Sequence, residues 1–99
     1  MPYLRQRAKI PATGRVTVRL DTTQRDWLEG AVGTPRALGH RLHRAPVHKG
    51  KLEIRVDREE LAALIAAAVG LPVADKQSER AIDSFVRYLE MQEERFADD

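Results

Sequence analysis

The chain has 99 residues, 42% hydrophobic and 32% charged, with a formal net charge of +2 and no cysteine. This length predicts one small domain over residues 1–99, with little volume for a deep catalytic cavity beside its core. The lack of cysteine excludes disulfides and thiolate metal sites and is typical of a reducing compartment.

The first twenty residues predict two strands. Tyr3–Ile10 and Arg15–Leu20 both alternate between apolar and basic side chains, which is the period of a half-buried strand. Pro11–Gly14 between them has the composition of a turn. We therefore expect residues 1–20 to form a β-hairpin with a basic outer face. A partly mobile N-terminal arm is the alternative for the first strand.

Two short helices are expected next. Asp21–Thr23 offers side-chain caps for a first helix, whose apolar stripe reaches Val32 and which Gly30 and Gly33 keep short. Thr34-Pro35 predicts the start of a second, with a cap followed by proline at the first helical position. Pro46 prevents that helix from continuing beyond about Arg44.

A strand and a helix follow. Lys51–Val56 alternates as a half-buried strand does. Asp57 and Glu60 are spaced nearly as a capping box, and the apolar run Leu61–Val69 after them has helical spacing. That run is about half as long as a membrane span requires. The N-terminus has no apolar stretch suited to a signal peptide, so we expect a cytoplasmic protein.

The last helix is expected to begin near Asp75 or Ser78 and to end near Phe96. Residues 97–99 would form a frayed acidic tail, because the helix dipole disfavours anions at a C-terminus. The predicted fold is a single α+β domain of order ββααβαα. Its three-stranded sheet, a hairpin plus one strand, would be covered on one face by the two C-terminal helices.

Two segments of the sequence resemble each other. Val16–Asp21 and Leu52–Asp57 have the same pattern of apolar, polar and acidic residues, and each leads into a capped helix. A decayed duplication would explain this. So would the general appearance of half-buried strands that precede helices.

Charge is distributed unevenly along the chain. Residues 1–51 carry eleven Lys or Arg against three Asp or Glu, a balance of +8. Residues 52–99 carry six against twelve, a balance of −6. Such asymmetry suggests an anionic partner. Alternatively, the halves neutralise each other within the fold or across a homodimer.

The three histidines, His40, His43 and His48, lie within nine residues. His40 and His43 would share a helix face, and a returning His48 would complete the three-histidine set of a hydrolytic zinc site. Against this, no Asp or Glu lies between Ala31 and Leu52, and several Arg and Lys would repel a dication. We expect no metal and no cofactor.

An anionic ligand suits this stretch better, because histidine, arginine and lysine contact phosphates. The basic hairpin could add a second such surface, although no known nucleic-acid-binding motif is present. Binding would then be directed at the backbone and sensitive to salt. A merely solvated face is the alternative. The candidate anion or nucleic-acid contacts are Arg5, Arg7, Lys9, Arg15, Arg19, His40, Arg41, His43, Arg44, His48 and Lys49.

The last helix offers candidate contacts with a protein. Tyr88, Met91 and Phe96 would be apolar surface suited to a dimer mate, although Phe96 could instead cover the end of the core. Ser78 and Ser84 have no histidine near them in sequence, so we expect no enzyme. The preferred hypothesis is a small non-catalytic regulatory protein of a bacterium or phage that binds another protein, as a homodimer. The alternative is nucleic-acid backbone binding by the basic N-terminal half.

Overall fold

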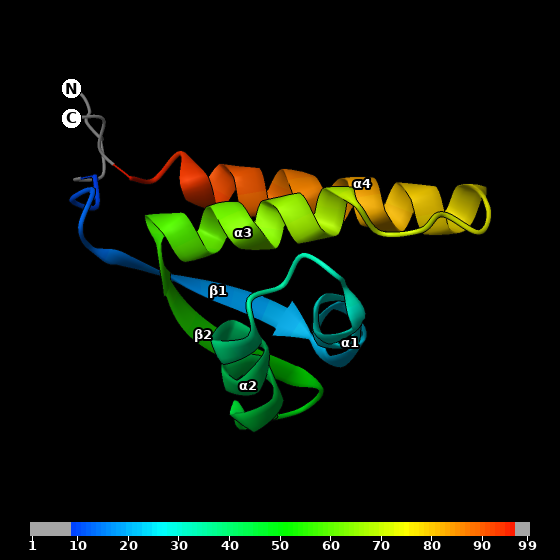
Figure 1. Cartoon of the computed structure of the whole chain (residues 1–99), viewed down its shortest axis with the longest axis horizontal. Coiled ribbons are helices and arrows are strands. Elements are labelled where there is room, and N and C mark those ends of the chain that lie inside the picture. The colour runs from blue at the N-terminus through cyan, green and yellow to red at the C-terminus, as the bar shows by residue number, and fades with distance from the viewer. Residues whose placement is uncertain (1–8, 97–99) are drawn as a thin grey trace.

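Each of two strands leads directly into a helix, and a second helix follows each time (Figure 1). The chain, whose computed structural model describes residues 9–96, is a small α+β domain of order βααβαα. Its elements are β1 (Arg15–Asp21), α1 (Thr22–Gly30), α2 (Arg36–Arg44), β2 (Lys51–Asp57), α3 (Arg58–Val69) and α4 (Lys76–Glu93).

The two strands form an antiparallel sheet, with register running from Arg15 opposite Asp57 to Asp21 opposite Lys51. Their apolar side chains lie on one face and are buried, as the alternation predicts. These side chains belong to Val16, Val18, Leu20, Leu52, Ile54 and Val56. The other face carries the polar and charged side chains of both strands.

The prediction of a three-stranded sheet with order ββααβαα is wrong for the described chain. Residues 3–8 of the expected first strand lie outside the described residues. Ile10 does not pair with β1; its N–H donates to the Arg95 carbonyl at 2.9 Å, and it forms a parallel bridge with Phe96. The expected turn is present, since the Gly14 N–H donates to the Pro11 carbonyl at 2.7 Å.

A physical reason for this difference is that α4 covers the outer edge of β1. Tyr88 on α4 accepts the Arg19 N–H with its hydroxyl oxygen at 2.8 Å, which is where a third strand would bind. On the outer edge of β2, the Arg41 guanidinium of α2 donates to the Arg55 carbonyl. Both edges of this small sheet are therefore protected by side chains from helices.

A two-residue turn at Lys49 and Gly50, just before β2, places His48 beside the first residue of that strand. His48 and Lys51 exchange hydrogen bonds, N–H to carbonyl, of 2.8 and 3.0 Å across Lys49 and Gly50, whose φ angles are 53° and 78°. Positive φ at both central positions is typical of a two-residue hairpin turn. Pro46 has no N–H to continue this pairing, so no strand forms there.

All four helices lie on the buried side of the sheet, which corrects the expectation that the two C-terminal helices alone cover it. In Figure 1, α3 and α4 run antiparallel and side by side, with α1 and α2 below them. α1 packs against β1, and α3 packs against β2. Leu28 of α1 and Leu38 and Leu42 of α2 belong to the same core as Phe85 of α4.

The helix starts follow the sequence signals in all but one case. Asp21 and Asp57 each accept an N–H at 2.7 Å, from Gln24 and Glu60 respectively, completing two capping boxes. α2 differs, because its N-cap is Pro35 and no side chain caps it. The expected cap, the Thr34 hydroxyl, instead donates to the Leu28 carbonyl at 2.6 Å.

The two similar segments, Val16–Asp21 and Leu52–Asp57, also occupy equivalent positions in the structure. A shift of 36 positions carries Asp21 onto Asp57 (21 + 36 = 57). The same shift carries Val18 onto Ile54, and these two residues are directly opposite in the sheet (18 + 36 = 54). An approximate two-fold axis through this pair therefore relates the two strands, and each half of the chain has the order βαα.

The C-terminal end of the described chain packs on the core. α4 ends at Glu93, three residues before the expected end, and Phe96 is buried beside Ile10. The predicted tail at 97–99 lies outside the described residues. Between residues 9 and 96, no helix is both long and apolar enough to cross a membrane.

Candidate functional site

The core of residues 9–96 contains no buried polar or charged side chain. Desolvation is the usual means of shifting the pKa of a catalytic acid or base. Of the two serines considered above, the Ser78 N–H donates to Asp75 at the start of α4, and Ser84 is exposed. Candidate sites in the described chain are therefore surfaces.

The first such surface is the outward face of α2. At 100° per residue, His40 lies opposite the buried pair Leu38 and Leu42, with Arg36 and Arg44 on either side of it. A shallow cleft of about 350 Å³ runs between this face and the end of α1. It is lined by Glu29, Thr34, Pro35, Arg36, Gly39, His40, His43 and Arg44.

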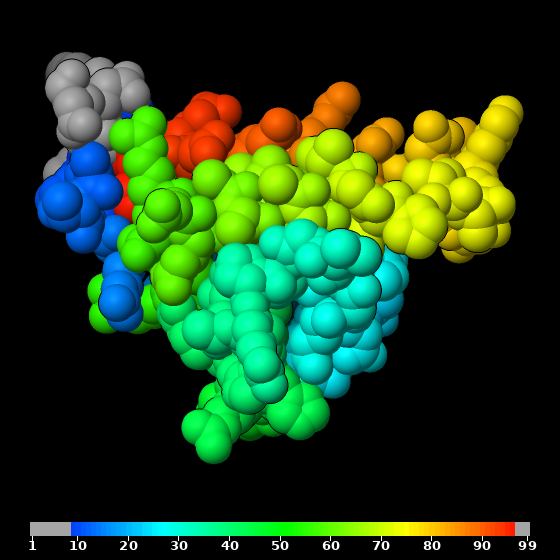
Figure 2. All heavy atoms as spheres, viewed as in Figure 1, coloured from blue at the N-terminus to red at the C-terminus, as the bar shows by residue number. Residues whose placement is uncertain are grey.

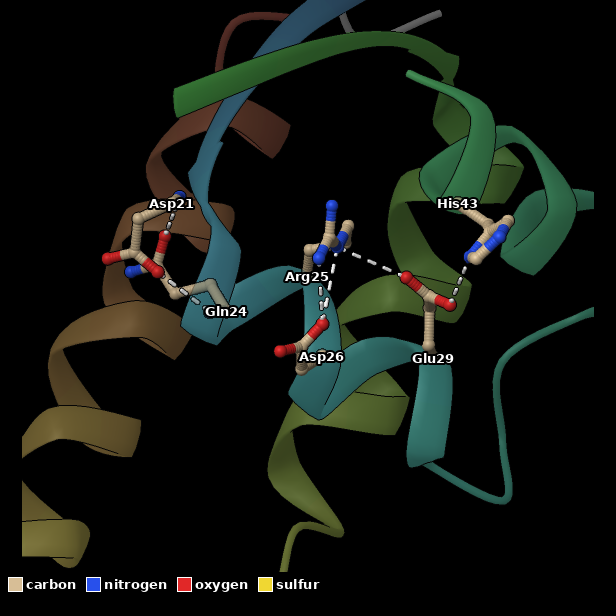
Figure 3. A network of polar contacts seen from close by, with 6 residues as sticks. All are labelled: Asp21, Gln24, Arg25, Asp26, Glu29 and His43. Atoms are coloured by element: carbon tan, nitrogen blue, oxygen red, sulfur yellow. Dashed lines mark hydrogen bonds and ion pairs between the residues drawn. The ribbon is translucent and has the colours of Figure 1, made fainter. Parts of the chain in front are cut away.

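One carboxylate in this cleft is held by two cationic or potentially cationic groups (Figure 3). One oxygen of Glu29 lies 3.2 Å from Nε of Arg25 in an ion pair, and its other oxygen lies 3.2 Å from Nδ1 of His43. Arg25 also pairs with Asp26 at 3.1 Å. The network joins α1 to α2, and Arg25 is shared between Glu29 and Asp26.

The histidines do not come together as a metal site among residues 9–96. His40 and His43 line the cleft, whereas His48 lies in the turn before β2. No group of three His, Cys, Asp or Glu side chains in that part of the chain is placed to hold a metal ion.

Several of the predicted anion contacts are neutralised within the fold. Arg19 pairs with Glu53 across the sheet at 2.9 Å, whereas Arg15 is exposed and forms no ion pair within residues 9–96. Arg41 turns inward to Glu60 at 2.6 Å. The Lys9 ammonium donates to the Glu94 carbonyl, and Arg5 and Arg7 lie outside the described residues. The expected basic outer face of β1 is thus balanced by a carboxylate of β2 at Arg19 and not at Arg15.

Four of the predicted contacts, His40, Arg44, His48 and Lys49, lie near Arg36 and Lys51, which were not predicted. We call these six residues of α2 and the following turn the basic pole. All six are exposed, and none forms an ion pair within residues 9–96. In Figure 1, α2 lies at the bottom, on the opposite side of the molecule from α4. Arg36 and Lys51 complete a set that the sequence analysis left short; the absence of acidic residues from 32 to 51 was the available signal.

The predicted protein contacts on α4 are divided between core and surface. Tyr88 is half-buried against the core and bonded to β1, and Phe96 is only 2% exposed. Met91 is 63% exposed.

A second surface, which the sequence analysis missed, is the outer side of α3. Its exposed stripe is Ala62, Ala66 and Val69, and residues 61–74 include no charged side chain. Val32 and Val73 in adjoining loops are 104% and 54% exposed. A signal was present in the sequence, because a surface helix normally has polar residues on its outer face.

A groove of about 560 Å³ adjoins this stripe, between the end of α1, the end of α3 and the start of α4. Its walls are mostly small or apolar, and Asp26 is the one charged residue in the set: Asp26, Trp27, Gly30, Ala31, Val32, Gly33, Ala66, Ala67, Gly70, Leu71, Pro72 and Ile82. We call the stripe, the groove and the exposed valines together the apolar face. In Figure 2 the atoms of α3 meet those of the loop after α1 across the middle of the view, and both segments contribute residues to this face.

Comparison with known protein families, with curated proteins and with solved structures finds no match to this chain. Its function is therefore inferred from the basic pole and the apolar face.

Proposed function

We propose that the chain is a non-catalytic interaction protein that forms a homodimer through its apolar face. The observation that carries the proposal is the outer stripe of α3. Over two turns, from Ala62 to Val69, this stripe exposes side chains that have no polar atom. Helices that are apolar on all sides are normally buried, and exposed apolar patches mark interaction sites.

A second copy of the chain fits this face for geometric reasons. Alanine side chains allow two helices to approach closely. A two-fold interface requires each surface to be complementary to itself. Here the projecting side chain of Val32 stands beside a groove with Gly33, Ala66 and Gly70 in its walls, so each copy offers both a projection and a recess.

Charge also favours this face over the alternatives for self-association. Two apolar faces bring together almost no charge, since Asp26 is the one charged residue of the groove and is paired with Arg25. Two basic poles would repel each other, because each carries four permanent cations without an ion pair in the described chain. The interface would therefore be insensitive to salt.

Sedimentation over a range of protein concentrations tests the proposal. The expected species has twice the 11.2 kDa mass of the chain. Ala66→Glu or Val32→Glu should weaken dimerisation at least about tenfold, because a carboxylate would be buried without a partner. Met91→Glu is the matched control, since it adds the same charge at an exposed apolar position on α4.

Two results would reject the homodimer. One is a monomer at every concentration, which would leave a different protein as the occupant of the apolar face. The other is loss of the dimer in Met91→Glu while Ala66→Glu remains dimeric, which would move the interface to α4. Circular dichroism of each variant separates loss of association from loss of folding.

A further inference from the structure

We infer that the basic pole is a binding site for the phosphate backbone of duplex nucleic acid. This activity is separate from the proposed dimer interface and requires neither its presence nor its absence. The site comprises Arg36, His40 and Arg44 on α2, and His48, Lys49 and Lys51 on the turn that follows.

The cations of the described chain differ in whether they have a carboxylate partner. Arg41 and Arg44 are one helical turn apart, yet Arg41 binds Glu60 and the Arg55 carbonyl, whereas Arg44 faces the cleft. Arg19 is likewise paired with Glu53. Arg19 and Arg41 thus have carboxylate partners, whereas the outer face of α2 has no counterion from residues 9–96.

The spacing of these cations suits a repeating anion. Arg36 and Arg44 are eight residues apart on one helix, which corresponds to about 12 Å along its axis. Lys49 and Lys51 extend the positive surface beyond the end of the helix. A duplex presents roughly one charge per 1.7 Å of its axis, so a surface of this length faces several phosphates.

The carboxylate inside the cleft does not oppose this assignment. Glu29 is already engaged by Arg25 and by the His43 ring, and it lies on α1 at the wall of the cleft.

A duplex fits better than a single strand. Proteins that bind single strands usually supply aromatic side chains on which bases stack. The basic pole contains no aromatic residue other than its histidines. Trp27, on the neighbouring helix, is half-buried and packs on Phe85 with ring centres 6.0 Å apart. Contacts would therefore be to phosphates and independent of sequence.

The size of the expected effect follows from counterion release. Four permanent cations, Arg36, Arg44, Lys49 and Lys51, predict a slope of log K against log salt of about −3.6. Affinity should then fall on the order of 100-fold between about 50 and 200 mM salt.

The experiment measures fluorescence anisotropy of a labelled random-sequence duplex with the full chain at both salt concentrations. Arg36→Glu with Arg44→Glu should lower affinity at least about 100-fold and make the salt slope shallower. The matched control is Arg80→Glu with Arg87→Glu, two exposed arginines of α4 on the far side of the molecule. This control changes the net charge by the same amount, and we expect it to lower the affinity for the duplex less than about fivefold.

A second, more conservative variant tests the same site in case the double charge reversal does not fold. Lys49→Gln with Lys51→Gln alters only the turn and its first strand residue, and it should reduce the slope by about 1.8 units. Equal losses in the pole variant and the α4 control would overturn the inference, because net charge alone would then explain binding. So would absence of binding at low salt, a salt-independent affinity, or tighter binding to a single strand than to the duplex.

Discussion

The two βαα repeats begin alike and end differently. In both, a strand leads through an aspartate capping box into a helix, and the equivalent residues Leu28 and Leu64 are completely buried (28 + 36 = 64). The second helices diverge. α4 has 18 residues and is capped by the Asp75 side chain, whereas α2 has nine and its N-cap residue, Pro35, provides no side-chain cap.

The outer faces of the first helices diverge as well. Asp26 of α1 is paired with Arg25, and the equivalent position in α3 is Ala62 (26 + 36 = 62). The strand register, the aspartate caps and one buried leucine are therefore common to the two repeats. We assign function to the apolar face because it exposes apolar side chains, and to the basic pole because its cations have no ion pair in the described chain.

The largest expected effect tests whether the repeats contribute equally to the core. Leu28→Ala and Leu64→Ala should each lower the free energy of unfolding by about 2–5 kcal/mol, because each leaves a cavity in a fully buried position. Urea denaturation followed by circular dichroism measures both. The exposed control Met91→Ala should stay within about 0.5 kcal/mol of the parent. A cost below about 1 kcal/mol for Leu28→Ala alone would mean that the first repeat contributes little to cooperative unfolding.

A smaller effect tests the two capping boxes. Asp21→Ala and Asp57→Ala should each cost about 1 kcal/mol, since each removes the acceptor for a backbone N–H at a helix start. Asn at either position keeps an acceptor and should recover most of the loss. Thermal unfolding of the four variants gives the comparison. If Asn is as destabilising as Ala at one site, that aspartate acts through its charge and not as a cap.

The sequence predicted well those features that depend on residues close together in the chain. The bounds of β2, α3 and most of α2 follow from alternation, caps and prolines that lie within a few residues of the element they define. The capping residues Asp57 and Glu60 are an example, because the hydrogen bonds that they make span three positions.

The sequence could not predict contacts between residues that are far apart in the chain. Ile10 bonds to Arg95 and not to its neighbour β1, and β1 pairs with β2 across a separation of some thirty residues or more. Arg19, Arg41 and Arg44 look alike in the sequence, and only their partners in the fold distinguish neutralised cations from free ones. The same limit applies to Phe96, whose burial depends on the distant Ile10.

The smallest expected effect concerns the second helices and depends on pH. The backbone N–H of Ser78, followed by the Ser78 hydroxyl, holds the pKa of Asp75 below its usual value of 3.8. Because the folded-state pKa is the lower one, the ionised carboxylate stabilises the folded chain above the unfolded pKa. That contribution is lost as the pH falls below 3.8 through the folded pKa.

Asp75→Asn should therefore be less stable than the parent near neutral pH, and the difference should shrink as the solution is acidified through this range. Ser78→Ala, which keeps the backbone N–H and removes the hydroxyl, should give a smaller change of the same sign. Urea denaturation at a series of pH values measures both. A difference between Asp75→Asn and the parent that stays constant with pH would show that α4 begins without help from the charge of Asp75. The starts of the two second helices would then differ in the hydrogen bond that caps α4 and not in charge.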